Sequence, residues 1–362
     1  MTISGSALGR AARVVWYGAG PWEALARGLL VLPSLGYRAA VAARNAAYDL
    51  GWVAARPLPA PSIGVGNLAV GGAGKTPLVR FFADGLARRG CHVGILARGY
   101  GNDEILELRE ALPGAVVVPD ADRHRGAREA LRLGAGALVL DDCLQRRDVA
   151  PDVMVAVVAS ETADAARWRL PAGPWREGLA ALERADVVVV TRKAAPPERA
   201  ARLADQLAPR TRRGEGVVVS FALARLRPLA GGDSAAPGRV LAGQRVVAAC
   251  GIGAPEAFAT QLRALGAARV DLAAFGDHHS FSRGDVASVR AGAGAGGLVV
   301  TTAKDATKLR ALWPAEPPNC WVAELDASVE RGDAVLERLL DGVAGWCREA
   351  HAGAPATKGG WP

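Results

Sequence analysis

The feature that most constrains the fold is a regular alternation of short apolar runs with helix-compatible segments between Ser62 and Lys193. Each run is nearly all apolar and rich in valine, which is typical of strands buried on both faces of a parallel sheet. The intervening segments, such as residues 78–89 and 122–133, predict helices that flank the sheet. The predicted strands are residues 63–65, 93–96, 115–118, 137–140, 153–158 and 187–190. The sequence therefore predicts an α/β domain with a mostly parallel sheet.

A change of composition predicts a domain junction after this alternation. Residues 192–216 are charged and contain proline, and they lead into two predicted strands and the loop "GGDSAAPGR". A second, smaller α/β unit follows, with strands predicted at 246–250, 270–274 and 298–301. We expect an N-terminal amphipathic segment (1–56), a larger domain (57–215), a smaller domain (216–330) and a flexible tail (349–362). A helix at about 330–348 is expected to pack back on the larger domain.

The first predicted strand runs into the glycine-rich sequence "GGAGKTP", which has the parts of a phosphate-binding loop. Its glycines allow backbone conformations that turn amide groups around an anion, and the helix that follows adds its positive end. Lysine at this position supplies a charge for the β- and γ-phosphates, and the next hydroxyl is a ligand for Mg²⁺. The predicted nucleotide-binding residues are Gly71, Gly72, Ala73, Gly74, Lys75, Thr76 and Pro77.

The wider context supports this interpretation, although the strict loop pattern has glycine where this chain has Ala69. A second strand, 137–140, ends on Asp141 and Asp142, the arrangement in which an aspartate reaches Mg²⁺. The alternative is that the two aspartates are solvated turn residues. With loop and aspartates in order, the sequence predicts a P-loop NTPase-type domain that binds ATP and Mg²⁺.

Composition excludes some classes of protein. The formal charge of +8 comes from scattered arginines and not from a Lys/Arg block, so nothing points to a nucleic acid or to an obligate protein partner. Five separated cysteines without a C-x-x-C pair argue against a disulfide framework or a zinc site. No uncharged apolar run is long enough for a conventional membrane span.

The segment 27–52, "RGLLVLPSLGYRAAVAARNAAYDLGW", mixes aliphatic, aromatic and arginine residues. Such a segment is able to lie in the plane of a bilayer interface, in peripheral contact with an anionic membrane. The alternative is an ordinary amphipathic helix packed on the domain.

Several ordered segments resemble the tetraacyldisaccharide 4'-kinase family of lipid A biosynthesis. They are "NLAVGGAGKTP", "GILARGYG", "DDCLQRRDVAPD", "LPAGPWREGLAALERADVVVVTR", "CGIGAPEAFATQLRALGA", "FGDHHSFSRGDV" and "VVTTAKDATKL". The resemblance implies a kinase that transfers the ATP γ-phosphate to the 4'-hydroxyl of a tetraacylated glucosamine disaccharide 1-phosphate. The product would be lipid IVA, a precursor of lipopolysaccharide. The enzyme would work as a peripheral or monotopic protein at the cytoplasmic face of the bacterial inner membrane.

The same resemblance implies roles for individual residues. Asp103 would be the catalytic carboxylate and His278 its partner from the smaller domain, a pair able to accept a proton near neutral pH. Lys75 and Arg123 would also belong to the catalytic group. Gln145, Arg176 and Arg98 would bind substrate, and Thr76, Asp141, Asp142 and Glu177 would form the metal network. The alternative for Arg123, Gln145, Arg176 and Glu177 is a surface ion-pair role.

The chain departs from the family pattern in two places. The turn "RGYG" directly precedes "NDE", where the family has a longer insertion and a glycine in place of Asn102. The family's DDGFQH is "DDCLQR" here, so Cys143, Leu144 and Arg146 replace a glycine, an aromatic residue and a histidine. Two alternatives therefore stay beside the lipid kinase: a P-loop kinase for a soluble substrate, and a catalytically impaired, membrane-associated nucleotide-binding homologue.

Overall fold

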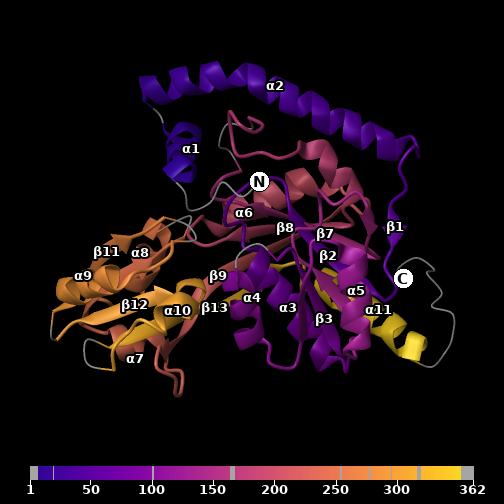
Figure 1. The fold of residues 1–362 in the computed structure, drawn as a ribbon. Helices are drawn as coiled ribbons and strands as arrows, with labels where there is room; N and C mark the ends of the chain where they lie inside the picture. The colour runs from indigo at the N-terminus through magenta and orange to yellow at the C-terminus, as the bar shows by residue number, and fades with distance from the viewer. Residues whose placement is uncertain are drawn as a thin grey trace. The chain divides into compact units, whose positions relative to one another are not determined.

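The structure is a computed structural model that describes residues 7–18, 20–99, 102–163, 168–252, 255–276, 279–294, 296–315 and 319–351. Within these ranges, the side chains of residues 7–10, 13, 102–104 and 351 are not described. The chain forms two compact units, coloured along the sequence in Figure 1. Unit 1 comprises Met1–Ala11, Gly101–Glu107 and Phe221–Ser328, and unit 2 comprises Ala12–Tyr100, Leu108–Ser220 and Val329–Pro362.

Unit 2 is built on a parallel sheet with the strand order β9-β8-β7-β2-β5-β3-β4. Its strands are β2 (Ser62–Asn67), β3 (Val93–Ala97), β4 (Val116–Pro119), β5 (Ala137–Leu140), β7 (Val153–Ala159), β8 (Val187–Arg192) and the first part of β9 (Glu215–Pro228). A separate short parallel pair joins β1 (Arg56–Pro57) to β6 (Val149–Ala150). Parallel strands with connecting helices on the faces are the expected arrangement for the alternating sequence.

Several helices lie wholly or partly in unit 2. They are α1 (Ala7–Tyr17, which begins in unit 1), α2 (Pro21–Asp49), α3 (Lys75–Arg88), α4 (Asn102–Ala111, which also begins in unit 1), α5 (Arg123–Arg132), α6 (Pro197–Leu207) and α11 (Asp333–His351), with two 3₁₀ turns, η1 (Leu179–Arg184) and η2 (Ala208–Arg210). Helix α3 packs against both β2 and α11. A Cβ on Gly85 of α3 would meet Leu340 at 2.7 Å, so glycine allows α11 to approach closely.

Unit 1 contains parallel strands in the order β11-β10-β12-β13. Its strands are β10 (Arg245–Cys250), β11 (Arg269–Ala274), β12 (Leu298–Thr302) and most of β13 (Cys320–Arg331). Its remaining helices are α7 (Pro237–Leu241), α8 (Pro255–Ala264), α9 (Arg283–Ala293) and α10 (Ala303–Leu309). The chain passes from one unit to the other within β9 and again within β13.

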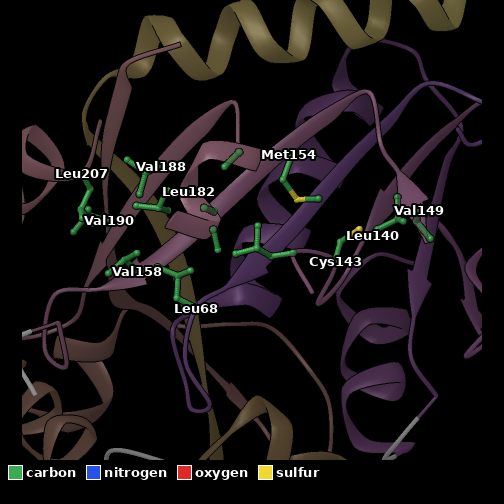
Figure 2. Close-up of a cluster of buried hydrophobic side chains, with 14 of the residues drawn as sticks. Leu68, Leu140, Cys143, Val149, Met154, Val158, Leu182, Val188, Val190 and Leu207 are labelled. Carbon is green, nitrogen blue, oxygen red and sulfur yellow. The ribbon is translucent and has the colours of Figure 1, made fainter. Parts of the chain in front are cut away.

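The core of unit 2 explains why the apolar runs form strands. Val188 and Val190 of β8 and Val158 of β7 point into a cluster of buried side chains, part of which Figure 2 shows. Leu68, three residues before Gly71 of the glycine-rich loop, is 2% exposed and belongs to the same cluster. Packing of this leucine therefore fixes one end of the loop to the core.

The predicted α/β fold with a mostly parallel sheet is confirmed, and the predicted strands appear with ends shifted by at most two residues. Two features differ from the prediction. Helix α4 was not predicted, because "NDE" directly follows a glycine-rich turn in the sequence. The two strands predicted after residue 216 are one continuous strand, β9, since no glycine or proline interrupts residues 217–227.

Candidate nucleotide-binding and phosphotransfer site

The glycine-rich loop joins a fully buried strand to a helix. Every residue of β2 is buried, and α3 begins at Lys75, so Thr76 and Pro77 occupy its first turn. Gly74 caps the helix in the left-handed conformation at φ 80°, and Gly71 has φ 126°, values that favour glycine. The predicted strand–loop–helix context is therefore present, with the positive end of α3 at the loop.

Neighbouring strands and segments hold this loop by its main chain. The N–H of Val70 donates to the carbonyl of Pro174 at 2.7 Å, and that of Arg176 donates to Leu68 at 2.8 Å. At the end of β8, the Thr191 hydroxyl donates to the Ala73 carbonyl at 2.9 Å. These bonds fix the loop on two sides before any ligand binds, which is the preorganisation that a phosphate site requires.

Lys193 adds a further contact that the sequence analysis did not identify. Its Nζ donates to the carbonyl of Gly72 at 3.3 Å. Burial lowers the pKa of Lys193, although Glu161 opposes that shift. The Glu161 carboxylate also accepts hydrogen bonds from the N–H groups of Ala194 and Ala195, at 3.1 and 3.4 Å. The feature of the sequence that could have indicated this lysine is the "TRK" that follows the predicted strand at 187–190.

A charged network connects the loop to the aspartates after β5. Nζ of Lys75 lies 3.5 Å from Oδ1 of Asp142, and Nη1 of Arg176 lies 2.8 Å from both carboxylate oxygens of Asp142. Burial alone would raise the pKa of Asp142, but the charges of Lys75 and Arg176 outweigh it and lower this pKa to about 2. Asp142 is therefore a carboxylate at neutral pH.

Two amide side chains complete this network. Lys75 donates to Oδ1 of Asn67 at 3.2 Å, and Nε2 of Gln145 donates to the carbonyl of Asn67 at 2.8 Å. Oε1 of Gln145 accepts from Arg176 at 3.3 Å. The structure therefore brings together Lys75, Asp142, Gln145 and Arg176, four residues that the sequence analysis selected, and adds Asn67.

The local conformation around Asp142 explains how the carboxylate reaches the loop. Asp142 has φ 54° and is the only non-glycine residue with a positive φ in the described part of the chain. Strained conformations of this kind concentrate at functional sites. The following segment packs directly on β2, since a Cβ on Gly66 would meet the main-chain nitrogen of Leu144 at 2.3 Å. Glycine at this strand position permits the close approach.

Arg123 lies beneath this turn and is 1% exposed. Its guanidinium donates to the main-chain carbonyls of Asp120 and Asp141, both at 2.8 Å. Burial lowers the pKa of Arg123, and the charges of nearby acidic groups oppose the shift. In this position Arg123 supports the turn that carries Asp141 and Asp142, and its predicted catalytic role stays a prediction.

The predicted metal network is only partly assembled. Asp141 is buried and precedes Asp142 in the chain. Glu177 is also buried, at 3% exposed, but its carboxylate contacts cationic and amide groups. Oε2 of Glu177 lies 2.7 Å from Arg184 and 3.0 Å from Nδ2 of Asn45, and Oε1 lies 3.3 Å from Arg44. Among the described residues, no group of three or more His, Cys, Asp or Glu side chains is arranged to hold a metal ion.

This arrangement still fits Mg²⁺ held together with nucleotide phosphates. Magnesium in kinase sites takes one or two protein oxygens and completes its shell with phosphates and water. Asp142 is ionised and lies beside Lys75, the residue before Thr76. The hydroxyl of Thr76 and the carboxylates of Asp141 and Asp142 are therefore the oxygens that suit this ion.

Three of the predicted residues lie at the margin of what is described. Arg98 directly follows β3 and is exposed. The backbone of Asp103 lies in α4, but its side chain lies outside the described residues, as does all of His278. The predicted pairing of Asp103 with His278 therefore stays a prediction.

The chain is similar to known proteins over most of its length. The sequence model of the tetraacyldisaccharide-1-P 4'-kinase family matches residues 26–344. A tetraacyldisaccharide 4'-kinase of Anaeromyxobacter sp. (strain K) is 39% identical over 89% of this chain and 92% of its own. That of Geobacter metallireducens is 35% identical over 79% of this chain and 90% of its own.

A solved structure gives the same result. The Aquifex aeolicus LpxK crystal structure in complex with ATP has a TM-score of 0.67 to this chain at 26% sequence identity, and it covers 88% of this chain and 99% of its own. In this chain the glycine-rich loop is joined to the ionised Asp142 through the Lys75 ion pair. Because the family model and the relatives match most of its length, the chain belongs to the tetraacyldisaccharide-1-P 4'-kinase family.

Proposed function

We propose that this protein transfers the γ-phosphate of ATP to the 4'-hydroxyl of tetraacyldisaccharide 1-phosphate and so forms lipid IVA in lipid A biosynthesis. The observation that carries the proposal is the ion-paired group of Lys75, Asp142 and Arg176 at the glycine-rich loop. Phosphoryl transfer depends mainly on charge neutralisation and positioning, and this group supplies both. The identity of the acceptor, tetraacyldisaccharide 1-phosphate, is inferred from membership of the family.

Before ATP binds, Lys75 and Arg176 are both paired with Asp142. In our proposal, Lys75 then turns towards the β- and γ-phosphates, while Arg176 stays on Asp142 or contacts the transferring phosphate. Asn67 and Gln145 orient these side chains through their hydrogen bonds. Thr76 and the Asp141–Asp142 pair would hold Mg²⁺, which neutralises phosphate charge when it is bound.

The acceptor hydroxyl also needs a group that takes its proton. We propose Asp103 for this role, with His278 as the partner that fixes its orientation and protonation. The proposal rests on the sequence resemblance of "NDE" and "DHH" to the family. We further propose that Arg98 contacts the acceptor.

The N-terminal helices support a peripheral membrane location. In the described part of the chain, large exposed apolar side chains concentrate between residues 14 and 53, and Trp22, Leu29 and Leu32 are 78%, 72% and 77% exposed. None of the described helices has the length and hydropathy needed to cross a bilayer. We propose that these side chains insert into the cytoplasmic face of the inner membrane, where the lipid acceptor resides.

The test is incubation of purified protein with γ-labelled ATP, Mg²⁺ and the disaccharide 1-phosphate in detergent micelles. We expect labelled lipid from the wild type and none from Asp103→Asn. Labelled lipid that still forms at the wild-type rate in Asp103→Asn would contradict the assignment of the carboxylate. ATP binding without transfer by the wild type, across a range of Mg²⁺ concentrations, would instead identify a catalytically impaired homologue.

A further inference from the structure

Two cysteines that are far apart in the sequence lie side by side in unit 2. Cys91 lies between α3 and β3, and Cys347 lies near the end of α11. Their side chains are within hydrogen-bond distance of each other. Both are free thiols and both are buried, at 6% and 3% exposed. We call these two residues the α3–α11 thiol pair.

The end of α3 holds the main chain of Cys91 in place. Gly90 has φ 83°, and its N–H donates to the carbonyl of Ala87 at 2.9 Å. The N–H of Cys91 donates to the carbonyl of Leu86 at 3.1 Å. Two such bonds around a left-handed glycine form the motif that commonly ends a helix, and they fix the residue that follows the glycine. The position of Cys91 is therefore set by the end of α3.

Helix α11 is held against the same end of α3 by both charge and packing. Nε of Arg89 lies 2.7 Å from Oδ1 of Asp341, and Nη2 of Arg89 pairs with the carboxylate of Glu337. Leu340 packs on α3, and Cys347 follows it by seven residues, which is about two helical turns. Leu340 and Cys347 therefore lie on the same face of α11, the face that meets α3.

The two thiols differ in how easily a small molecule reaches them. Burial and the neighbouring Cys347 raise the pKa of Cys91, so this thiol is protonated at neutral pH and reacts slowly as a nucleophile. Cys347 lies about one turn before the end of α11, and the three residues after it, 348–350, are exposed. Helix ends open locally at low cost, so opening of this last turn exposes Cys347 first.

From these contacts we infer that Cys91 and Cys347 are an oxidative modification site, at which a peroxide converts the two thiols into a disulfide. The Cys347 thiolate attacks a peroxide oxygen, the O–O bond breaks, and one water leaves after protonation. The sulfur of Cys91 then attacks the sulfenic sulfur of Cys347, the S–O bond breaks, and a second water leaves. The two thiols lose two electrons and two protons, and hydrogen peroxide is reduced to two waters.

The disulfide would join α11 to the end of α3 and so close a long loop of the chain. Cross-links of this kind stabilise a protein mainly by restricting its unfolded state, and the effect increases with the length of the loop. Helix α3 has 14 residues and begins at Lys75, so the cross-link lies about 20 Å from the glycine-rich loop. The inference therefore concerns stability, and it does not depend on the phosphotransfer reaction.

The first measurement looks for the cross-link directly in the full-length wild type. The protein is treated with hydrogen peroxide, the remaining thiols are blocked, and a tryptic digest is analysed by mass spectrometry without reduction. We expect peptide 90–98 joined to peptide 339–348, and a fall from five free thiols to three in the denatured protein. Oxidation of single cysteines without this joined peptide, or five thiols that stay free, would overturn the inference.

The second measurement tests the effect on stability. We expect peroxide to raise Tm of the wild type by about 5 °C, and dithiothreitol to reverse the rise. Cys91→Ser and Cys347→Ser should show no rise, whereas Cys320→Ser, at a buried cysteine of unit 1, should keep it. A rise that persists in Cys347→Ser, or a cross-linked wild type without any rise, would refute the stabilising role. If a serine variant does not fold, the joined peptide and the thiol count of the wild type decide.

Discussion

Unit 2 and unit 1 each place an aspartate near the carboxyl end of a parallel strand, but the two carboxylates have opposite surroundings. Asp142 follows β5 and is paired with Lys75 and Arg176, which lower its pKa to about 2. Asp305 follows β12, is fully buried, and accepts hydrogen bonds from the N–H of Gly251 and the hydroxyl of Thr302, both at 2.8 Å. Burial raises the pKa of Asp305.

A position at the end of a parallel strand is therefore not sufficient to make an aspartate part of a binding site. Both regions also have a nearby glycine that allows a close approach, Gly66 in one unit and Gly251 in the other. In unit 2 the carboxylate meets cationic side chains, which are also able to bind phosphate. In unit 1 it meets main-chain and hydroxyl donors that join the loop after β10 to the start of α10, which is a structural role.

Loss of the Lys75 side chain should reduce activity more than any other substitution described below. We expect Lys75→Met to lower kcat about a thousandfold, because the transferring phosphate loses its direct positive charge. Circular dichroism should remain that of the wild type, since Lys75 is only partly buried. Steady-state kinetics with ATP and acceptor measure the effect, and Arg202→Ala on the exposed surface of α6 is the control. A decrease of less than tenfold would remove Lys75 from the catalytic group.

The next prediction concerns stability against pH at the two aspartates. Since the folded pKa of Asp142 is below its unfolded value of about 4, its ionisation stabilises the fold above that pH by about 2 kcal/mol. That contribution disappears as the pH falls through about 2. We expect Asp142→Asn to lose it at neutral pH, as measured by urea unfolding.

Asp305 should show the opposite dependence. Its folded pKa is raised, so the wild type loses stability as the pH rises from the unfolded value of about 4 through the folded one. We expect Asp305→Asn to remove this decline, because asparagine keeps an acceptor for Gly251 without a charge. Parallel pH profiles for the two variants would contradict the proposed difference between the two regions.

A smaller effect is expected at Lys193. We expect Lys193→Met to raise KM for ATP about tenfold with little change in KM for the acceptor, because the loop loses its contact with the end of β8. Lys308→Met is the matched variant in unit 1, where Nζ donates to the carbonyl of His279 at 3.1 Å. An equal rise in KM for ATP in both variants would show that the Lys193 contact is not specific to the nucleotide site.

The sequence predicted the parts of the site that are local in the chain. Strand, glycine loop and helix follow one another, and the apolar strand before Asp141 and Asp142 placed these aspartates at the same edge of the sheet. The sequence did not predict contacts between distant segments. Glu177 and Arg44 are 133 positions apart, and Lys193 and Gly72 are 121 apart, so these pairings depend on how segments pack.

Alanine substitutions at Gly71 and Gly72 test whether these two loop glycines are equally tolerant of a side chain. A Cβ on Gly72 would have only Nζ of Lys193 near it, at 3.8 Å, and Gly72 has no positive φ. Gly72→Ala should therefore change the free energy of unfolding by less than about 0.5 kcal/mol. Gly71→Ala should lower that free energy by about 1 kcal/mol or more, because alanine is strained at φ 126°. Urea unfolding of both variants measures the difference, and equal losses would show that the loop does not keep this conformation in solution.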